Sequence, residues 1–189
     1  TDIAERKNCL ITGASSSAAI GAMQIAKSFG LKTIAVSRTL KKEKDLKKIG
    51  YDHVLALSDP KIEKNILDIT GGIGFDLCYD CVGGEHFYKL VNTVKARGLI
   101  VNYGNLDLNY SKIYTLPLLG KRVHIRFHSI FDTMRFENQR EEGVQWINEQ
   151  MENKVLNPII SKVFSLINIV ESHKYLAEGN QLGKTVVVT

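Results

Sequence analysis

The sequence predicts an α/β fold in which a doubly wound parallel sheet is covered by helices on both faces. Short apolar or β-branched runs alternate with segments of helical periodicity along most of the 189 residues. Glycines stand where the pattern changes from helix to strand. Strands and helices that alternate at this spacing are joined by right-handed crossovers, which produce three layers, α/β/α. We therefore expect a Rossmann-like domain.

Four strand–helix pairs occupy the first half of the chain. The predicted strands span residues 8–13, 32–36, 53–57 and 75–81, and the helices that follow them span 15–29, 41–49, 59–70 and 85–94. Within the first helix, small and apolar residues recur at spacings of three and four, and Gly30 ends it. Pro60 suits the first turn of the third helix.

The second half of the chain is less regular. We predict strands over 98–103 and 123–130, a helix over 140–153, and a final strand, helix and strand over 158–164, 167–178 and 185–188. Residues 105–119 are polar and poorly periodic, which indicates a break in the pattern. The expected division is a dinucleotide-binding domain over 1–154 and a short C-terminal β-α-β tail over 155–189.

Composition excludes several classes of protein. Of the residues, 44% are hydrophobic and 24% charged, and no apolar run is long enough to span a membrane. No secretion leader is recognised, so nothing in the sequence indicates secretion. Cys9, Cys78 and Cys81 provide no disulfide framework, so we expect a reducing, cytoplasmic setting. Cys78 and Cys81 have the spacing of half a zinc site or of a redox pair, but no second pair completes it, and we expect buried strand residues.

The turn after the first predicted strand is built from small residues. It reads Gly13-Ala-Ser-Ser-Ser-Ala-Ala-Ile-Gly21, and it opens a helix whose unpaired N–H groups could hold a pyrophosphate. Strict G-x-G-x-x-G is absent, so an ordinary serine-rich helix cap is the alternative.

The end of the second predicted strand is basic. Domains that bind NAD usually carry an acid there for the ribose 2′-hydroxyl, whereas this chain has Ser37-Arg38-Thr39. Residues 38–48 contain six basic and two acidic side chains. A guanidinium can pair with a 2′-phosphate, so the pattern favours NADP(H) over NAD(H). A solvated helix face is the alternative, and no aromatic interleaving supports nucleic acid binding.

Three motifs in order resemble the medium-chain dehydrogenase/reductase superfamily, in its quinone oxidoreductase and zinc-type alcohol dehydrogenase-like branch. They are Leu10-Ile-Thr-Gly-Ala-Ser-Ser-Ser with Ile34-Ala-Val-Ser-Arg-Thr, the segment 74–84, and the tail from Val163 through Gly183-Lys-Thr-Val-Val. The resemblance implies a two-domain enzyme, with a GroES-like domain absent here that supplies much of the substrate pocket and any zinc ligands. It implies no zinc in this segment, and a tail that packs on the other domain.

The resemblance also implies cofactor contacts. Residues expected at the pyrophosphate are Ser15, Ser16, Ser17 and Ala18; at the 2′-phosphate, Ser37, Arg38 and Lys42; near the adenosine half, Asp80, Cys81 and Val82; and toward the nicotinamide, Tyr103, Gly104, Asn105, Phe127, His128 and Ser129. The chain departs from the family pattern at Ser17 and Ala19, where many relatives have Gly, and at Leu57, where some have Tyr.

The function expected from this resemblance is hydride transfer from NADPH to a quinone or an enone-like carbonyl compound. No catalytic residue is nominated, since His128 is better explained as a polar strand position, and we expect this segment alone to be inactive. The alternatives are a zinc-dependent alcohol dehydrogenase and a non-catalytic NADP(H)-binding module. The resemblance also implies a homodimer in which the predicted strand 123–130 pairs antiparallel with its copy, and a free hydrophobic edge there would otherwise invite aggregation.

Overall fold

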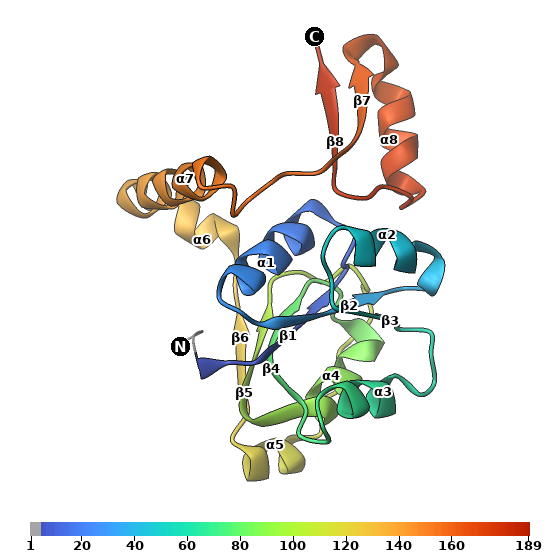
Figure 1. The fold of residues 1–189 in the computed structure, drawn as a ribbon, viewed down its shortest axis with the longest axis vertical. Coiled ribbons are helices and arrows are strands. Elements are labelled where there is room, and N and C mark those ends of the chain that lie inside the picture. Colours follow the sequence, from blue (N-terminus) through green and yellow to red (C-terminus); the bar gives the residue numbers. More distant parts are fainter. Residues whose placement is uncertain (1–4) are drawn as a thin grey trace.

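The structure is a computed structural model, and it describes residues 5–189. A six-stranded parallel sheet forms the centre of the molecule (Figure 1). The strand order is β3-β2-β1-β4-β5-β6, and every neighbouring pair is parallel. The strands are β1 (Asn8–Thr12), β2 (Lys32–Ser37), β3 (His53–Ala56), β4 (Phe75–Asp80), β5 (Val94–Asn102) and β6 (His124–Phe127). The predicted Rossmann-like α/β fold is confirmed.

Helices cover both faces of this sheet (Figure 1). One face carries α1 (Ser17–Ser28) and α2 (Glu43–Lys48), and the other carries α3 (Ile62–Ile69), α4 (Phe87–Thr93) and α5 (Thr115–Lys121). Side chains alternate along a strand, so β1 supplies both cores. Leu10 packs toward α3 and α4, whereas Cys9 and Ile11 pack toward α1.

A C-terminal β-α-β tail follows two helices and stands apart from the main sheet (Figure 1). The elements are α6 (Ile130–Met134), α7 (Glu137–Glu152), β7 (Ile160–Ser165), α8 (Ile169–Ala177) and β8 (Lys184–Val188). β7 and β8 form their own parallel pair. The tail contacts the domain beside α1, where the Gln24 side chain exchanges two hydrogen bonds of 3.0 Å with the backbone of Asn157.

The structure differs from the predicted elements in three places. Residues 115–121 form α5 despite their weak periodicity, because Leu118 packs against the core. The strand predicted over 123–130 ends at Phe127, and the chain turns at Ser129 into α6. β5 begins at Val94 rather than residue 98, since Val94 pairs with Phe75 before a bulge.

Two general expectations can be checked in the structure. Cys9, Cys78 and Cys81 are buried and unbridged, as predicted. Burial raises the pKa of the Cys9 thiol to about 12, which keeps it neutral. Over residues 5–189, no helix has both the length and the apolar character needed to cross a bilayer.

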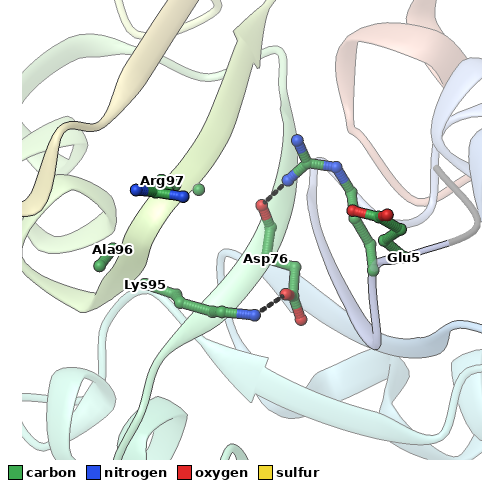
Figure 2. A pocket seen from close by; sticks show the side chains of 7 residues that line it. Glu5, Asp76, Lys95, Ala96 and Arg97 are labelled. Atoms are coloured by element: carbon green, nitrogen blue, oxygen red, sulfur yellow. Dashed lines mark hydrogen bonds and ion pairs between the residues drawn. The ribbon is translucent and has the colours of Figure 1, made fainter. Parts of the chain in front are cut away.

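A buried carboxylate joins the strands at the amino-terminal edge of the sheet (Figure 2). The Asp76 side chain is only 6% exposed; it pairs with the Lys95 ammonium at 2.5 Å and accepts the backbone N–H groups of Lys7 and Asn8, both at 3.1 Å. The Arg6 guanidinium donates to the Asp76 carbonyl. Burial alone would raise the pKa of the Asp76 carboxyl, but the Lys95 and amide hydrogen bonds outweigh it and lower that pKa. The carboxylate therefore stabilises the fold at neutral pH.

We predict that Asp76→Asn lowers the free energy of unfolding by about 1–3 kcal/mol at pH 7, because charged hydrogen bonds are lost in a buried place. A carboxyl with a lowered folded pKa stabilises above its unfolded pKa, and that stabilisation disappears as the pH falls below roughly 4. Urea unfolding at pH 7, 5 and 3 should therefore show the wild-type and variant curves converging in acid.

The control is Asp68→Asn, which removes an exposed ion pair with Lys64. It should change the free energy of unfolding by less than about 1 kcal/mol. A pH-independent difference between Asp76→Asn and wild type would contradict the role given to the carboxylate.

Candidate functional site at the carboxyl edge of the sheet

The direct pairing of β1 with β4 creates a crevice at the carboxyl edge of the sheet. β1 pairs with β2 on one side and with β4 on the other, so the connections that follow β1 and β4 leave toward opposite faces. In open α/β sheets this switch point is where ligands bind. Here the two strand ends are joined by a hydrogen bond of 2.6 Å from the Thr12 hydroxyl to the Asp80 carboxylate.

Asp80 fixes the shape of the chain beyond β4. Its side chain is fully buried and accepts four hydrogen bonds. One oxygen accepts the Thr12 hydroxyl and the amide of Val82 at 3.2 Å, and the other accepts the amide of Gly83 at 3.1 Å and the Asn102 side chain at 2.8 Å. The carboxylate therefore holds the ends of β1, β4 and β5 together.

The turn after β1 presents free backbone donors. Gly13 has φ +59°, a left-handed conformation that favours glycine. Ser16 caps α1, and its hydroxyl accepts the amide of Ala19 at 3.2 Å. Ser17 and Ala18 are exposed, and their amides have no acceptor among residues 5–189. Unpaired N–H groups at the start of a twelve-residue helix favour an anion.

The Cys81 side chain packs against this turn. A Cβ placed on Gly13 would lie 2.5 Å from the Cys81 sulfur, so the turn packs directly against the thiol. The Cys81 amide donates to the Thr12 hydroxyl at 3.0 Å. Burial raises the pKa of the Cys81 thiol, which keeps it neutral beneath the turn. Cys81 thus positions the turn, while Val82 beside it reaches the crevice.

A cleft of about 790 Å³ opens beside the turn, between the ends of β1, β2, β3 and β4. Four predicted site residues line it, namely Ser15, Ser37, Arg38 and Val82. The other lining residues are Gly13, Ala14, Val36, Leu57, Ser58, His86, Leu106, Asp107 and Ala177. The cleft therefore combines apolar walls with one cationic side chain at its rim.

Arg38 and Lys42 face different surroundings. Arg38 is exposed and lines the cleft, so its guanidinium is accessible to a ligand. The Lys42 ammonium lies outside the cleft lining and hydrogen-bonds the Ser15 hydroxyl at 3.2 Å and the carbonyls of Gly179 and Gln181 at 2.7 Å. Burial, with the nearby Arg38 charge, lowers the pKa of Lys42. Of the two cationic side chains predicted to hold the 2′-phosphate, only Arg38 therefore lines the cleft.

The residues predicted near the nicotinamide lie at or just beyond the ends of β5 and β6, outside the cleft lining. The Tyr103 ring stacks on Tyr79 with centroids 4.0 Å apart. Gly104 packs on the Cys81 backbone, and the Asn105 side chain lies against Gly83. Phe127, His128 and Ser129 are exposed, and the His128 amide donates to the Asn102 carbonyl at 2.9 Å. These residues lie at the same carboxyl edge of the sheet as the cleft, but they do not form its walls.

Sequence reasoning missed part of the site. Ser58 follows β3, a strand end that could have been included as a further lining position. Asp107 also lines the cleft, and its carboxylate accepts the amide of Glu85 at 3.2 Å. This contact joins residues that are far apart in the sequence, so no local pattern predicts it. Ala177 comes from α8, and His86 from the turn before α4. Over residues 5–189, no three His, Cys, Asp or Glu side chains gather as metal ligands.

A family described as zinc-binding dehydrogenase matches residues 19–149 of the chain, which is more than half of it. The chain belongs to this family. The predicted membership of the medium-chain dehydrogenase/reductase superfamily is thereby confirmed. The match includes most of α1, the basic stretch after β2 and the strands from β2 to β6, and it begins after β1.

Curated relatives and solved structures resemble this family member over nearly its whole length. A 2-haloacrylate reductase from Burkholderia is 25% identical over 86% of the chain and half of its own length. An acryloyl-coenzyme A reductase from Sulfurisphaera tokodaii is 30% identical over 94% of the chain and 49% of its own length. The chain thus spans about half the length of these relatives.

Two solved structures share the fold. An NAD-dependent alcohol dehydrogenase has a TM-score of 0.84 at 23% identity and covers 97% of this chain and 51% of its own. A mycobacterial protein complexed with NADPH has a TM-score of 0.85 at 19% identity and covers 97% of this chain and 58% of its own.

We predict that Gly13→Ala destabilises the fold by about 2–4 kcal/mol, because a left-handed alanine costs about 1–2 kcal/mol and its methyl group also meets the Cys81 sulfur. In a Cys81→Ala background, the clash disappears and the penalty should fall to the backbone cost alone. Chemical unfolding of the four proteins in this double-mutant cycle measures the coupling.

Gly21→Ala provides the matched control, since a Cβ there meets nothing within 4 Å and lies inside α1. This change should stabilise the protein by about 0.5–1 kcal/mol. Equal Gly13→Ala penalties in both backgrounds would show that the turn does not rest on Cys81.

Proposed function

We propose that this chain is the NADP(H)-binding domain of an oxidoreductase that transfers hydride from NADPH to an enone-like or quinone substrate. The observation that supports it is one juxtaposition: Arg38 lines the same cleft as Gly13, Ala14 and Ser15, the turn that leads into α1 with its free amides. An anion-binding helix terminus and a separate cation fit the pyrophosphate and the 2′-phosphate of one dinucleotide.

The cleft has the chemical character that the adenosine half of this cofactor needs. Val36, Leu57, Val82 and Leu106 form apolar walls that fit an adenine ring, and Ser37 and Ser58 add hydroxyl groups. The small side chains of Ala14 and Ser15 let a pyrophosphate approach the backbone. Side chains longer than these at the turn would hold the phosphates away from the amides of Ser17 and Ala18.

The cofactor supplies the hydride when it is bound, and the protein's part is to bind, orient and exclude water. The ends of β5 and β6 lie further along the same edge, so Tyr103, Gly104 and Asn105 are the residues proposed to approach the nicotinamide. We assign no proton-transferring residue. His128 is exposed, and among residues 5–189 its imidazole has no hydrogen-bond partner that would orient it.

Conjugated alkenes are the substrate class we favour. Two relatives are named as reductases of 2-haloacrylate and of acryloyl-coenzyme A, which both carry a carbon–carbon double bond next to a carboxyl-derived group. A zinc-dependent alcohol dehydrogenase remains the second candidate because of the family's description. Ligands for such a zinc would come from a second domain, since residues 5–189 do not group them.

We further propose that residues 155–189 pack on that second domain. The neighbouring apolar surface of α6 and α7 is proposed to pack on it as well. α6 and α7 expose Phe131, Ile147 and Met151, and the tail exposes Ile167 and Val170. Exposed apolar side chains in this number need a cover. This exposed apolar surface is the reason we propose a dinucleotide-binding unit over 1–154 and a separate tail over 155–189.

A homodimer through β6 is also proposed. β6 is the free edge of the sheet, and its Phe127 side chain is 74% exposed. The amide of His128 points to β5, so by strand alternation the amide of Phe127 points to the open side. An outward N–H on an edge strand is a ready donor to a second copy.

Phe127→Pro removes this outward donor and should convert a dimer to a monomer in sedimentation velocity. Phe127→Thr alters the same side chain but keeps the backbone N–H, so it should remain dimeric. A monomeric wild-type chain, or an unchanged dimer in Phe127→Pro, would contradict the proposal.

Arg38→Ala tests the cofactor assignment. We expect NADPH binding to weaken by about 1–3 kcal/mol, the cost of losing a charged hydrogen-bonded partner, while NADH binding changes little. Isothermal titration of both cofactors measures the difference. Lys41→Ala, three residues away and exposed, is the control and should leave both affinities within about twofold. Equal losses for NADPH and NADH in Arg38→Ala would overturn the role of Arg38.

A further inference from the structure

The Lys42 side chain bridges two segments that lie far apart in the sequence. Its ammonium has three N–H donors, and three protein oxygens accept them: the Ser15 hydroxyl, the Gly179 carbonyl and the Gln181 carbonyl. Ser15 belongs to the turn before α1, whereas Gly179 and Gln181 belong to the loop between α8 and β8. The hydrogen-bonding capacity of Lys42 is thus fully used inside the protein.

The same two segments meet at a second point. The amide of Gly183 donates to the Ser15 carbonyl at 2.8 Å, and Gly183 forms a parallel bridge with Ser16. Ser15 therefore holds the tail with its backbone and Lys42 with its hydroxyl. A ligand that binds to the turn and restricts its motion therefore also restricts Ser15, which is hydrogen-bonded to the tail.

Geometry also separates the two cations. Arg38 lines the cleft, and a Cβ on Gly179 would lie 3.4 Å from its guanidinium nitrogen, whereas the Gly179 carbonyl accepts a hydrogen bond from Lys42, so both side chains contact this residue of the tail loop. A phosphate that reached Lys42 would have to displace at least one of its three protein acceptors. Arg38 can accept a phosphate with no such exchange, because no protein acceptor holds its guanidinium among the residues described.

We propose that Lys42 is a positioning residue that couples the turn before α1 to the tail loop 179–183, so that a dinucleotide bound at the turn and the docked tail stabilise each other. Discrimination between NADPH and NADH then falls to Arg38. This inference rests on the proposed function, since it assumes that the turn binds the pyrophosphate. It gives the tail a role at the cofactor site in addition to packing on another domain.

Loss of Lys42 should loosen the link without unfolding the domain. The tail keeps its bidentate contact between Gln24 and Asn157 and the Gly183–Ser15 hydrogen bond. Lys42 itself is partly exposed and lies at the start of α2, outside both core clusters. A neutral side chain of similar length is therefore tolerated.

The experiment compares Lys42→Met with wild type, with Lys41→Met as the matched control and Lys42→Arg as the conservative variant. Amide hydrogen exchange at Gly183 and Lys184 reports the docking of the tail, and titration gives the affinities for NADPH and NADH. In Lys42→Met we expect exchange at Gly183 to rise about tenfold, an effect of the size of one charged hydrogen bond. NADPH should slow that exchange in wild type and in Lys42→Arg, but not in Lys42→Met.

The two affinities should fall together in Lys42→Met and leave the NADPH-to-NADH ratio within about twofold of wild type. A ratio that falls as far as in Arg38→Ala would make Lys42 a phosphate ligand and overturn the proposal, as would unchanged exchange at Gly183. If wild type binds neither dinucleotide, the proposed function fails, while exchange without cofactor still shows whether Lys42 holds the tail.

Discussion

The adjacency of β1 and β4 is the constraint on which the rest of the structure depends. Because these two strands pair directly, the chain must leave their ends toward opposite faces, and a crevice opens between the departing segments. Asp80 secures this arrangement from a fully buried position, where its carboxylate binds Thr12 from β1 and Asn102 from β5. The floor of the candidate site is therefore a hydrogen-bonded unit of three strands.

Most of the binding potential of this floor comes from the backbone. The free amides at the start of α1 need only small residues around them, so a serine-rich turn can take the place of a glycine-rich one. Side chains then tune the site: Cys81 supports the turn from beneath, and Arg38 adds charge at the rim. This division explains how the chain keeps the family fold while departing from the family's glycine pattern.

The fold could be predicted from the sequence wherever local pattern and burial agree. The first four strands and their helices lie within a few residues of the predicted ranges, because strands of a parallel sheet buried on both faces appear as short apolar runs. α5 could not be predicted, since contact of Leu118 with the core, not periodicity, stabilises it. β6, an exposed edge strand, was predicted too long because alternation continues past the turn at Ser129.

The candidate site was predictable where its residues directly follow strands. Ser15, Ser37, Arg38 and Val82 all come within a few residues of a strand end, and all line the cleft. Lys42 shows the limit of this reasoning, because two of its three acceptors lie 137 and 139 residues further along the chain. Asp107 and Ala177 reach the cleft through similar long-range packing, for which a single sequence carries no signal.

An NMR titration of the labelled chain with 2′,5′-ADP, with 5′-AMP as the comparison, tests the central claim most directly. The account predicts that both nucleotides perturb the amide resonances of Ser15, Ser17 and Ala18, and that only the 2′-phosphate perturbs the Arg38 side chain. Perturbations confined to the amino edge around Asp76, or none at the turn before α1, would contradict it.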